Sequence, residues 1–327
     1  MSAAGPAWRG RRVLVTGGAG FIGSGLCHAL AAAGAEVVAL DAMLPEGGAN
    51  RANLRDSGVR LIEADLREAD LAPHTEGLDA VFNLAAQTSH AGSMADPFTD
   101  LAINATAQLR LMAALRAGSP KAVVVHASTR QFYGRPRYLP VDEKHPIAPP
   151  DANGVSKLAG EQYWLMEGRV HGRPVVSLRL TNCYGPRLRV RDARQTFLGI
   201  WFRRLLESEP FEVWGGEQLR DLAYLDDVVA AFLRAAETPA CAGQTFNIGG
   251  APPVSLRELA ELAIAANGAG HYVVKEFPAD RAPIDIGSFH ADDAAFRAAT
   301  GWAPVVSLPE GLRRSLDWLR PRLANYL

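Results

Sequence analysis

The chain has 327 residues with 34 basic and 35 acidic side chains, so it can bury a large core and is nearly neutral overall. The sequence has no run of basic residues that could contact successive phosphates, which argues against nucleic acid as a partner. Its apolar stretches are too short for membrane spans, and residues 1–8 lack the features of a signal peptide, so we expect a cytosolic protein with no membrane partner. Cys27, Cys183 and Cys241 are too scattered to form a disulfide framework or a metal site.

The first predicted elements are a strand and a helix joined by a glycine-rich turn. The strand covers residues 13–15, and the helical pattern runs from Phe21 to Ala33. Gly17 permits the sharp turn, Gly20 lets the backbone approach a phosphate, and Gly23 lets the helix pack on the strand. The N-terminus of such a helix points at a pyrophosphate. This arrangement predicts a dinucleotide site.

An acidic residue follows the second predicted strand, which runs from Glu36 to Leu40. Asp41 comes directly after this apolar run. A carboxylate at this place can accept hydrogen bonds from ribose hydroxyls, and it would repel a 2′-phosphate. The sequence therefore predicts NAD rather than NADP as the cofactor.

Short strands and helices continue to alternate along the first half of the chain. Further strands are predicted at 61–62, 80–84, 122–126 and 175–180, with helices at 97–117 and 153–170. This alternation predicts an α/β protein with a Rossmann-type, doubly wound parallel sheet. The proline-rich stretch 136–150 predicts an irregular loop.

Several motifs, taken in order, resemble those of the extended short-chain dehydrogenase/reductases that act on nucleotide-linked sugars. They lie at 16–23, 65–66, 83–87, 128–134, 156–161 and 179–186, with later matches at 213–221, 226–228, 246–249 and 301–302. The resemblance covers nearly the whole chain. It implies tightly bound NAD, a nucleotide-sugar substrate, and a homodimer formed through the helices at 97–117 and 153–170.

The glycine motif and the resemblance together assign residues to the two ligands. The expected cofactor residues are Gly17, Gly20, Phe21, Ile22, Gly23, Asp41, Asp65, Leu66, Leu84, Ala85, Ala86, Gln87 and Lys157. The residues expected at the nucleotide sugar are Ser89, Thr129, Arg130, Asn182, Arg187, Gln218, Arg220 and Arg281. Arginine suits this role because a guanidinium can hold two phosphate oxygens at once. A solvated surface position is the alternative for Arg281.

One position departs from the family pattern. The family's general base is a tyrosine four residues before the lysine, assisted by a serine or threonine. Lys157 and Thr129 are present, but Asn153 stands at the tyrosine position, and an amide cannot act as the base near neutral pH. Three explanations stay open: another group takes the proton, the reaction needs less base assistance, or the protein binds without turnover. If another group takes the proton, Asn153 would orient a sugar hydroxyl.

The nearest titratable candidate for the missing base is His90. It lies in the segment after the strand at 80–84, which the resemblance places beside the sugar. The alternative is a histidine that only forms a surface hydrogen bond. The catalytic set expected from the sequence is therefore Thr129, Lys157, Asn153 and His90.

The residues after Thr129 bear on the type of reaction. Sugar dehydratases of the family place an acid pair there, whereas this chain has Arg130 and Gln131. Dehydration needs a base and an acid, which an arginine and an amide do not readily supply. We therefore expect an NAD-dependent nucleotide-sugar epimerase that oxidises a sugar carbon transiently to a ketone. The alternatives are a dehydratase, a decarboxylase or a dehydrogenase on the same substrate class, and a non-catalytic binding protein.

Two domains are expected. An NAD-binding domain covers residues 1–180, and the segment 218–240 returns to it, while residues 181–217 and 241–327 form a smaller C-terminal α/β lobe for the nucleotide sugar. Ala102, Ala105 and Ala113 could form a closely packed dimer face. Packing on the protein's own sheet is the alternative for these alanines.

Overall fold

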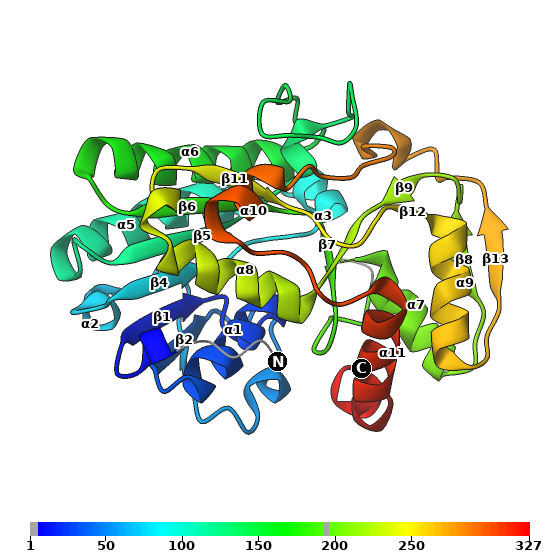
Figure 1. The fold of residues 1–327 in the computed structure, drawn as a ribbon, viewed down its shortest axis with the longest axis horizontal. Helices are drawn as coiled ribbons and strands as arrows, with labels where there is room; N and C mark the ends of the chain where they lie inside the picture. Colours follow the sequence, from blue (N-terminus) through cyan, green and yellow to red (C-terminus); the bar gives the residue numbers. More distant parts are fainter. Residues whose placement is uncertain (1–5, 193–195) are drawn as a thin grey trace.

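A seven-stranded parallel sheet forms the larger domain in a computed structural model that describes residues 6–192 and 196–327 (Figure 1). Residues 1–5, part of the segment without signal-peptide features, lie outside the described residues. The strand order is β11-β6-β5-β4-β1-β2-β3. The strands are β1 Arg12–Thr16, β2 Glu36–Asp41, β3 Arg60–Glu63, β4 Ala80–Asn83, β5 Val123–Thr129, β6 Val175–Leu180 and β11 Thr245–Ile248. The expected Rossmann-type α/β fold is confirmed.

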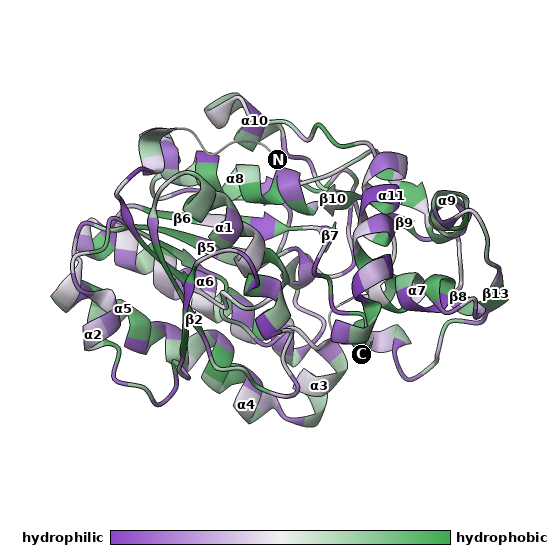
Figure 2. Cartoon of the chain, turned by 90° about the horizontal axis from the view of Figure 1, so that it is seen from below, coloured by the Kyte–Doolittle hydropathy of each residue, from purple (hydrophilic) through white to green (hydrophobic). Residues whose placement is uncertain are grey.

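Helices cover both faces of this sheet because its strands are apolar on both sides. Figure 2 shows central strands such as β5 and β6 as largely hydrophobic. Val13 and Val15 of β1 belong to a core with helices α1 and α8, whereas Leu14 faces a second core with α5 and α6. These helices are α1 Phe21–Ala32, α5 Ala107–Gly118, α6 Ala152–His171 and α8 Leu225–Glu237.

The prediction of one uninterrupted helix over 97–117 is wrong, because a π-helical turn interrupts the segment. The segment consists of α4 Pro97–Leu101, a π-helical turn at Ala102–Thr106, and α5. Within the turn, Asn104 accepts a hydrogen bond from the Gln87 backbone N–H at 3.0 Å and donates one to Asp100 Oδ1 at 3.1 Å. The π-helical turn thus contains the Asn104 side-chain amide that bonds the segment after β4.

The alanines expected at a dimer face do not share one free surface. Ala105 is buried within the protein, Ala102 is half-buried and Ala113 is exposed. The π-helical turn packs against α6, so Ala105 lies between elements of the same chain. A close approach of two chains over all three alanines is therefore not available.

The larger domain includes more of the C-terminal half than expected. Helix α8 packs on α1, so part of the segment 218–240 lies on the larger domain. Strand β11 pairs with β6, and helix α10 (Ala294–Thr300) covers it through a Phe246–Phe296 contact of 5.3 Å between ring centroids. Residues assigned to the lobe from 241 onward are thus partly in the sheet, because β11 supplies a hydrogen-bonding partner to the edge of β6.

The smaller lobe lies beside the larger domain at the right of Figure 1. Its main elements are α7 Phe197–Leu206, β8 Phe211–Trp214, α9 Leu256–Asn267, β13 Tyr272–Lys275 and α11 Leu308–Leu319. Strand β13 pairs in parallel with β8. The remaining short elements are α2 Ala72–Thr75, α3 His90–Ala95, β7 Asn182–Tyr184, β9 Leu219–Arg220, β10 Leu222–Tyr224 and β12 Val254–Ser255.

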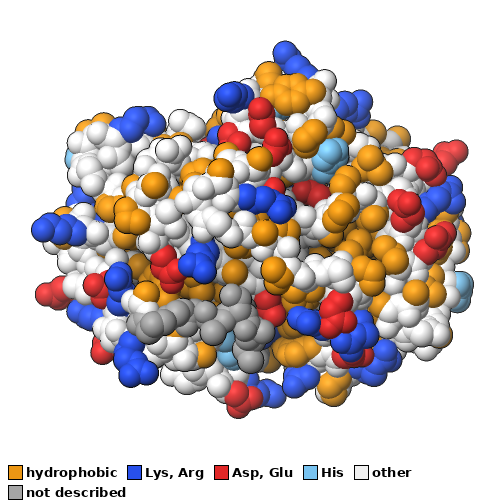
Figure 3. Space-filling model, viewed as in Figure 1, with side chains coloured by type: hydrophobic (Ala, Val, Ile, Leu, Met, Phe, Trp, Pro, Cys, Tyr) orange, Lys and Arg blue, Asp and Glu red, His pale blue; other side chains and the backbone are white. Residues whose placement is uncertain are grey.

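The surface carries charges of both signs. The face shown in Figure 3 has basic and acidic side chains scattered among apolar ones, as a nearly neutral chain would have. Within residues 6–192 and 196–327, no helix has the length and apolar character needed to cross a membrane. The same residues contain no group of three or more His, Cys, Asp or Glu side chains arranged to hold a metal ion.

Candidate active site

A cavity of about 850 Å³ opens at the carboxyl ends of the sheet strands. Its walls include Gly17 after β1, Asp41 at the end of β2, Leu84 after β4 and Thr129 at the end of β5. Strand β1 lies between β2 and β4, so the strand order reverses at this point. Ligands of doubly wound sheets bind in the crevice that such a reversal creates.

Most of the residues singled out from the sequence line this cavity. They include every expected cofactor residue, namely Gly17, Gly20, Phe21, Ile22, Gly23, Asp41, Asp65, Leu66, Leu84, Ala85, Ala86, Gln87 and Lys157. At the other end the lining contains Ser89, His90, Thr129, Arg130, Asn153 and Asn182. The fold therefore brings the two sets together in one continuous space.

Glycines form a cradle at the first turn of α1. Gly17 has φ of +66°, and a Cβ there would meet the Leu84 carbonyl carbon at 2.8 Å. A Cβ on Gly23 would overlap the carbonyl oxygen of Gly17. Gly20 is the N-cap of α1 and supplies no side-chain cap, so the helix N-terminus can meet a phosphate through its backbone N–H groups.

Two carboxylates border the adenosine side of the cradle. Asp41 Oδ2 accepts from the Ala19 N–H at 3.1 Å and Oδ1 from the Met43 N–H at 3.0 Å. Burial raises the pKa of Asp41, and these two hydrogen bonds oppose the shift. Asp65 is held by Arg67, with 2.6 Å between Nη2 and Oδ2, and this contact lowers the pKa of Asp65. The glycine cradle, the uncapped helix and Asp41 together fit a dinucleotide such as NAD.

Asn153 is anchored by its own amide. Its Nδ2 donates to the Gln87 carbonyl at 3.0 Å and to Asp100 Oδ1 at 2.9 Å, and only 1% of the residue is exposed. Both N–H bonds of the amide are therefore used, which leaves the Oδ1 atom as its hydrogen-bonding group toward the cavity. Asp100 and Asn104, which complete this network, were not found by sequence reasoning. The signal was a pair of polar residues on the apolar side of a predicted helix.

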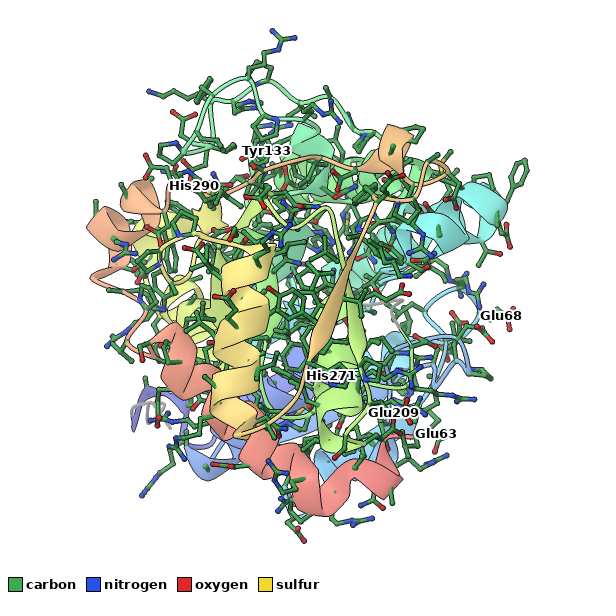
Figure 4. The ribbon with its side chains drawn as sticks, turned by 90° about the vertical axis from the view of Figure 1, so that its right-hand side faces the viewer. Glu63, Glu68, Tyr133, Glu209, His271 and His290 are labelled. Carbon is green, nitrogen blue, oxygen red and sulfur yellow. The ribbon has the colours of Figure 1, made fainter. Side chains whose placement is uncertain are left out.

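Tyr133 does not replace the missing phenol, although it lies only four residues beyond Thr129. Figure 4 shows it beneath the irregular segment 134–150. Its hydroxyl donates to Asn247 Oδ1 at 2.8 Å and accepts from Arg179 Nη1 at 2.7 Å, and its side chain is fully buried. Burial raises the pKa of Tyr133 to about 12. This tyrosine is thus part of the core.

Lys157 lies one helical turn after Asn153 on α6, where it also lines the cavity. Burial lowers the pKa of Lys157 to about 8, and the charge of Asp100 opposes this shift. The Lys157 ammonium therefore loses its proton more readily than that of an exposed lysine.

His90 is paired with a carboxylate that the sequence analysis missed. His90 Nδ1 lies 2.8 Å from Asp151 Oδ2. Asp151 is the N-cap of α6, and its Oδ1 accepts from the Gly154 N–H at 2.7 Å. Gln131 Nε2 donates to the same Oδ2 at 2.9 Å. The available signal was an aspartate two residues before the helix predicted from 153, since aspartate is a frequent N-cap.

Arg130 holds an unused hydrogen-bond donor near Thr129. Its Nη2 donates to Asn182 Oδ1 at 2.6 Å, and its guanidinium lies 5.0 Å from the centroid of the Phe289 ring. Its Nη1 is buried and has no protein partner among the described residues. Burial and the nearby charge of Arg220 lower the pKa of Arg130 to about 10. This end of the cavity therefore favours a ligand with acceptor oxygens.

Four residues expected at the nucleotide sugar do not line the cavity. Arg187 is half-buried, lies 5.8 Å from the Trp318 ring centroid, and has a buried Nε with no hydrogen-bond partner among the described residues. Gln218 bonds the Gly216 N–H and the Trp214 carbonyl, and Arg281 lies over the Trp214 ring at 4.7 Å. Arg220 is buried behind Arg130 and donates to the Leu219 and Gly287 carbonyls. Substrate contacts by these residues stay predictions.

Comparison with known proteins agrees with this geometry. The NAD dependent epimerase/dehydratase family matches residues 13–249. A UDP-glucose 4-epimerase of Mycolicibacterium smegmatis is 34% identical over 313 residues, which cover 94% of this chain and 98% of that protein. The solved UDP-glucose 4-epimerase of Thermotoga maritima with UDP-glucose has a TM-score of 0.87 and 29% identity, covering 95% of this chain and 99% of that one. The UDP-glucuronic acid 4-epimerase of Bacillus cereus, in complex with UDP-glucuronic acid and NAD, has a TM-score of 0.84 and 27% identity, covering 95% and 98%. The chain therefore belongs to the NAD dependent epimerase/dehydratase family of extended short-chain dehydrogenase/reductases, with NAD as cofactor.

Proposed function

We propose that the protein is an NAD-dependent nucleotide-sugar epimerase. One continuous cavity carries this proposal. It has a dinucleotide cradle at one end, and its lining also contains Thr129, Lys157, Arg130 and Asn182. When bound, NAD accepts a hydride from a sugar carbon and returns it to the resulting ketone. Return to the opposite face of the ketone inverts the carbon.

The side chains at the sugar end suit binding and orientation of a nucleotide sugar. The Thr129 hydroxyl and the free Asn153 Oδ1 can bond sugar hydroxyls, since both atoms lie on residues that line the cavity. Arg130 and its partner Asn182 also line the cavity, so a cation and an amide can meet phosphate or sugar oxygens there. Lys157 adds a second cation to the lining, one helical turn from Asn153.

Two alternatives follow from particular residues. A dehydratase is disfavoured because Gln131 is engaged with Asp151 and Arg130 is bonded to Asn182, so neither supplies an acid or base for loss of water. A non-catalytic binding protein is the second candidate function. It is favoured by Asn153, whose Nδ2 is bonded twice within the protein and whose amide cannot take a proton.

Incubation with NAD and a panel of nucleotide sugars, followed by mass spectrometry and NMR, tests the proposal. An epimerase yields a product of unchanged mass with one inverted carbon and no accumulating NADH. Loss of water indicates a dehydratase, loss of carbon dioxide a decarboxylase, and accumulating NADH a dehydrogenase. Tight binding of nucleotide sugars without conversion would overturn the epimerase in favour of a binding protein.

We also propose a homodimer that uses α4 and α6. These two helices pack together, and they carry exposed apolar side chains: Phe98 is 83% and Leu101 45% exposed on α4, and Val155 is 55% and Tyr163 38% exposed on α6. A second copy of the chain would bury them.

Replacing Phe98 with aspartate tests this dimer, since it places a charge in the proposed interface. Sedimentation should show a dimer for the native protein and monomers for Phe98→Asp. Val305→Asp is the matched control, because Val305 is also 83% exposed but lies in the segment before α11. A native monomer, or an unchanged dimer in Phe98→Asp, contradicts the proposal.

A further inference from the structure

The sugar end of the cavity needs a proton acceptor that is neither Asn153 nor a tyrosine. Oxidation of an alcohol to a ketone releases the hydroxyl proton, and a positioned base assists this step. Asn153 has no ionisable group, and the hydroxyl of Tyr133 is buried and bonded elsewhere. A different side chain on the cavity wall must therefore supply the base if the protein turns over.

His90 has the geometry of an activated imidazole. It lines the cavity, its side chain is 43% exposed, and its Nδ1 lies 2.8 Å from a carboxylate that is fully buried. The contact joins α3 to the start of α6 across 61 positions of the chain. One ring nitrogen is thus anchored in the protein, whereas Nε2 has no hydrogen-bond partner given among the described residues of this partly exposed, cavity-lining side chain.

Asp151 fixes the tautomer of this imidazole. Burial alone would raise the pKa of Asp151, but hydrogen bonds from His90, Gly154 and Gln131 hold it below its ordinary value. The position at the N-terminus of the 20-residue helix α6 also stabilises a negative charge. An ionised carboxylate only accepts hydrogen bonds, so Nδ1 carries the proton and the lone pair of neutral His90 lies on Nε2.

Gln131 connects this pair to Thr129. The backbone N–H of Gln131 donates to Thr129 Oγ1 at 3.1 Å, and its side chain donates to Asp151 Oδ2 at 2.9 Å. Thr129, Gln131, Asp151 and His90 therefore form one hydrogen-bonded chain around the sugar end of the cavity. Thr129 and His90 both line the cavity, so a sugar hydroxyl placed against Thr129 shares this space with the imidazole.

We infer that the His90–Asp151 pair is the acid/base of this active site, with His90 as the proton acceptor and Asp151 as its positioning residue. The inference rests on the proposed epimerase function. In the oxidation step the sugar O–H bond breaks and its proton forms an N–H bond at Nε2 of His90. NAD held by the glycine cradle would supply the oxidant for the carbon hydrogen and its electron pair, so that the sugar would become a ketone and His90 an imidazolium. Both transfers reverse when the ketone is reduced.

The first test replaces each member of the pair and measures turnover of the nucleotide sugar that the native enzyme converts. His90→Gln should lower kcat by about 100-fold or more, with KM and NAD affinity nearly unchanged. Asp151→Asn keeps an N-cap on α6, so the fold is retained, and kcat should fall at least about tenfold. His171→Gln, at the exposed end of the same helix, is the matched control and should retain native turnover.

The second test reads the tautomer without any turnover. At mildly alkaline pH, imidazole ¹⁵N chemical shifts, assigned by their loss in His90→Gln, should show a protonated Nδ1 in the native protein. In Asp151→Asn an amide N–H can face Nδ1, which should move the proton to Nε2. A protonated Nε2 in the native protein overturns the inference, whatever the activity.

The outcomes separate this inference from the proposed function. Native-level kcat in His90→Gln overturns the pair and leaves the epimerase standing, with Lys157, one helical turn from Asn153, as the next candidate base on the cavity lining. A native protein that binds NAD and nucleotide sugars but converts none of them overturns the proposed function and the acid/base role together. Loss of turnover in His90→Gln together with a protonated Nδ1 supports both.

Discussion

The two ends of the cavity are built in different ways. The cofactor end consists largely of backbone, with the glycine cradle at Gly17 to Gly23 and the carboxylate of Asp41 at the next strand end. The sugar end consists of side chains that hold one another, in the His90–Asp151–Gln131 and Asp100–Asn104–Asn153 networks. The glycines of the cofactor end tolerate little change, because backbone atoms surround them. The side-chain networks of the sugar end, in contrast, form a polar site with Asn153 in place of the family's tyrosine.

The largest expected effect comes from breaking the cofactor end alone. In Gly23→Ala the added methyl overlaps the Gly17 carbonyl oxygen, so α1 must move away from the turn after β1. Such overpacking costs about 1–3 kcal/mol of the free energy of unfolding, and NAD affinity should fall about 10- to 100-fold. Urea denaturation and calorimetric titration with NAD measure the two quantities.

Ala32→Ser is the control for this substitution, because Ala32 is exposed at the other end of α1. It should leave NAD affinity within twofold of native. Native NAD affinity and stability in Gly23→Ala would show that the cradle is not as tight as its backbone contacts indicate.

An intermediate effect is expected from breaking the sugar end alone. Arg130→Met keeps an unbranched side chain against Phe289 but removes the buried donor Nη1 and the bond to Asn182. Loss of a hydrogen bond to a charged group lowers affinity about tenfold, here for the nucleotide sugar that the native protein is found to bind, while NAD affinity stays native. Calorimetric titration with each ligand checks both values.

Arg234→Met serves as the control, since Arg234 is an exposed arginine on α8, away from the cavity lining. It should change neither affinity. Equal losses of NAD and nucleotide-sugar affinity in Arg130→Met would contradict a division of the cavity into two independently built ends.

The smallest effect concerns Lys157, which lines the cavity one helical turn after Asn153. Its folded pKa of about 8 is below the ordinary value of 10.5, so the unfolded chain binds more protons between these values. The burial penalty is therefore fully present below about pH 8 and is relieved as pH rises toward 10.5. Lys157→Met should raise the free energy of unfolding at neutral pH by on the order of 1 kcal/mol, and it should flatten the rise in stability at alkaline pH.

Urea denaturation of the protein without ligands, repeated across this pH range, checks the prediction for Lys157. Lys121→Met, at an exposed position before β5, is the control and should follow the native pH profile. A Lys157→Met profile parallel to the native one at every pH would mean that the lysine is well solvated.

Sequence reasoning was most accurate where backbone conformation limits the choice of residue. The fold class, which the structure confirms, and the glycine turn follow from local patterns. Asp41 was expected from its place after a strand and Leu84–Gln87 from the resemblance, and the structure places these residues in one cavity. Local patterns say less about the arginines of the C-terminal half, whose substrate contacts stay predictions. Arg187 contacts Trp318, more than a hundred positions away, and no local pattern predicts this contact.

The sequence by itself therefore determined the dinucleotide site and the absence of a tyrosine at position 153, because both depend on residue identity at fixed local spacing. Only the tertiary structure decided what surrounds that position. Packing of α3 and the π-helical turn against α6 gives His90 its carboxylate partner and leaves Asn153 with both N–H bonds engaged. Such side-chain pairs join residues far apart in the chain, and their distances are set by how whole elements pack rather than by spacing along the sequence.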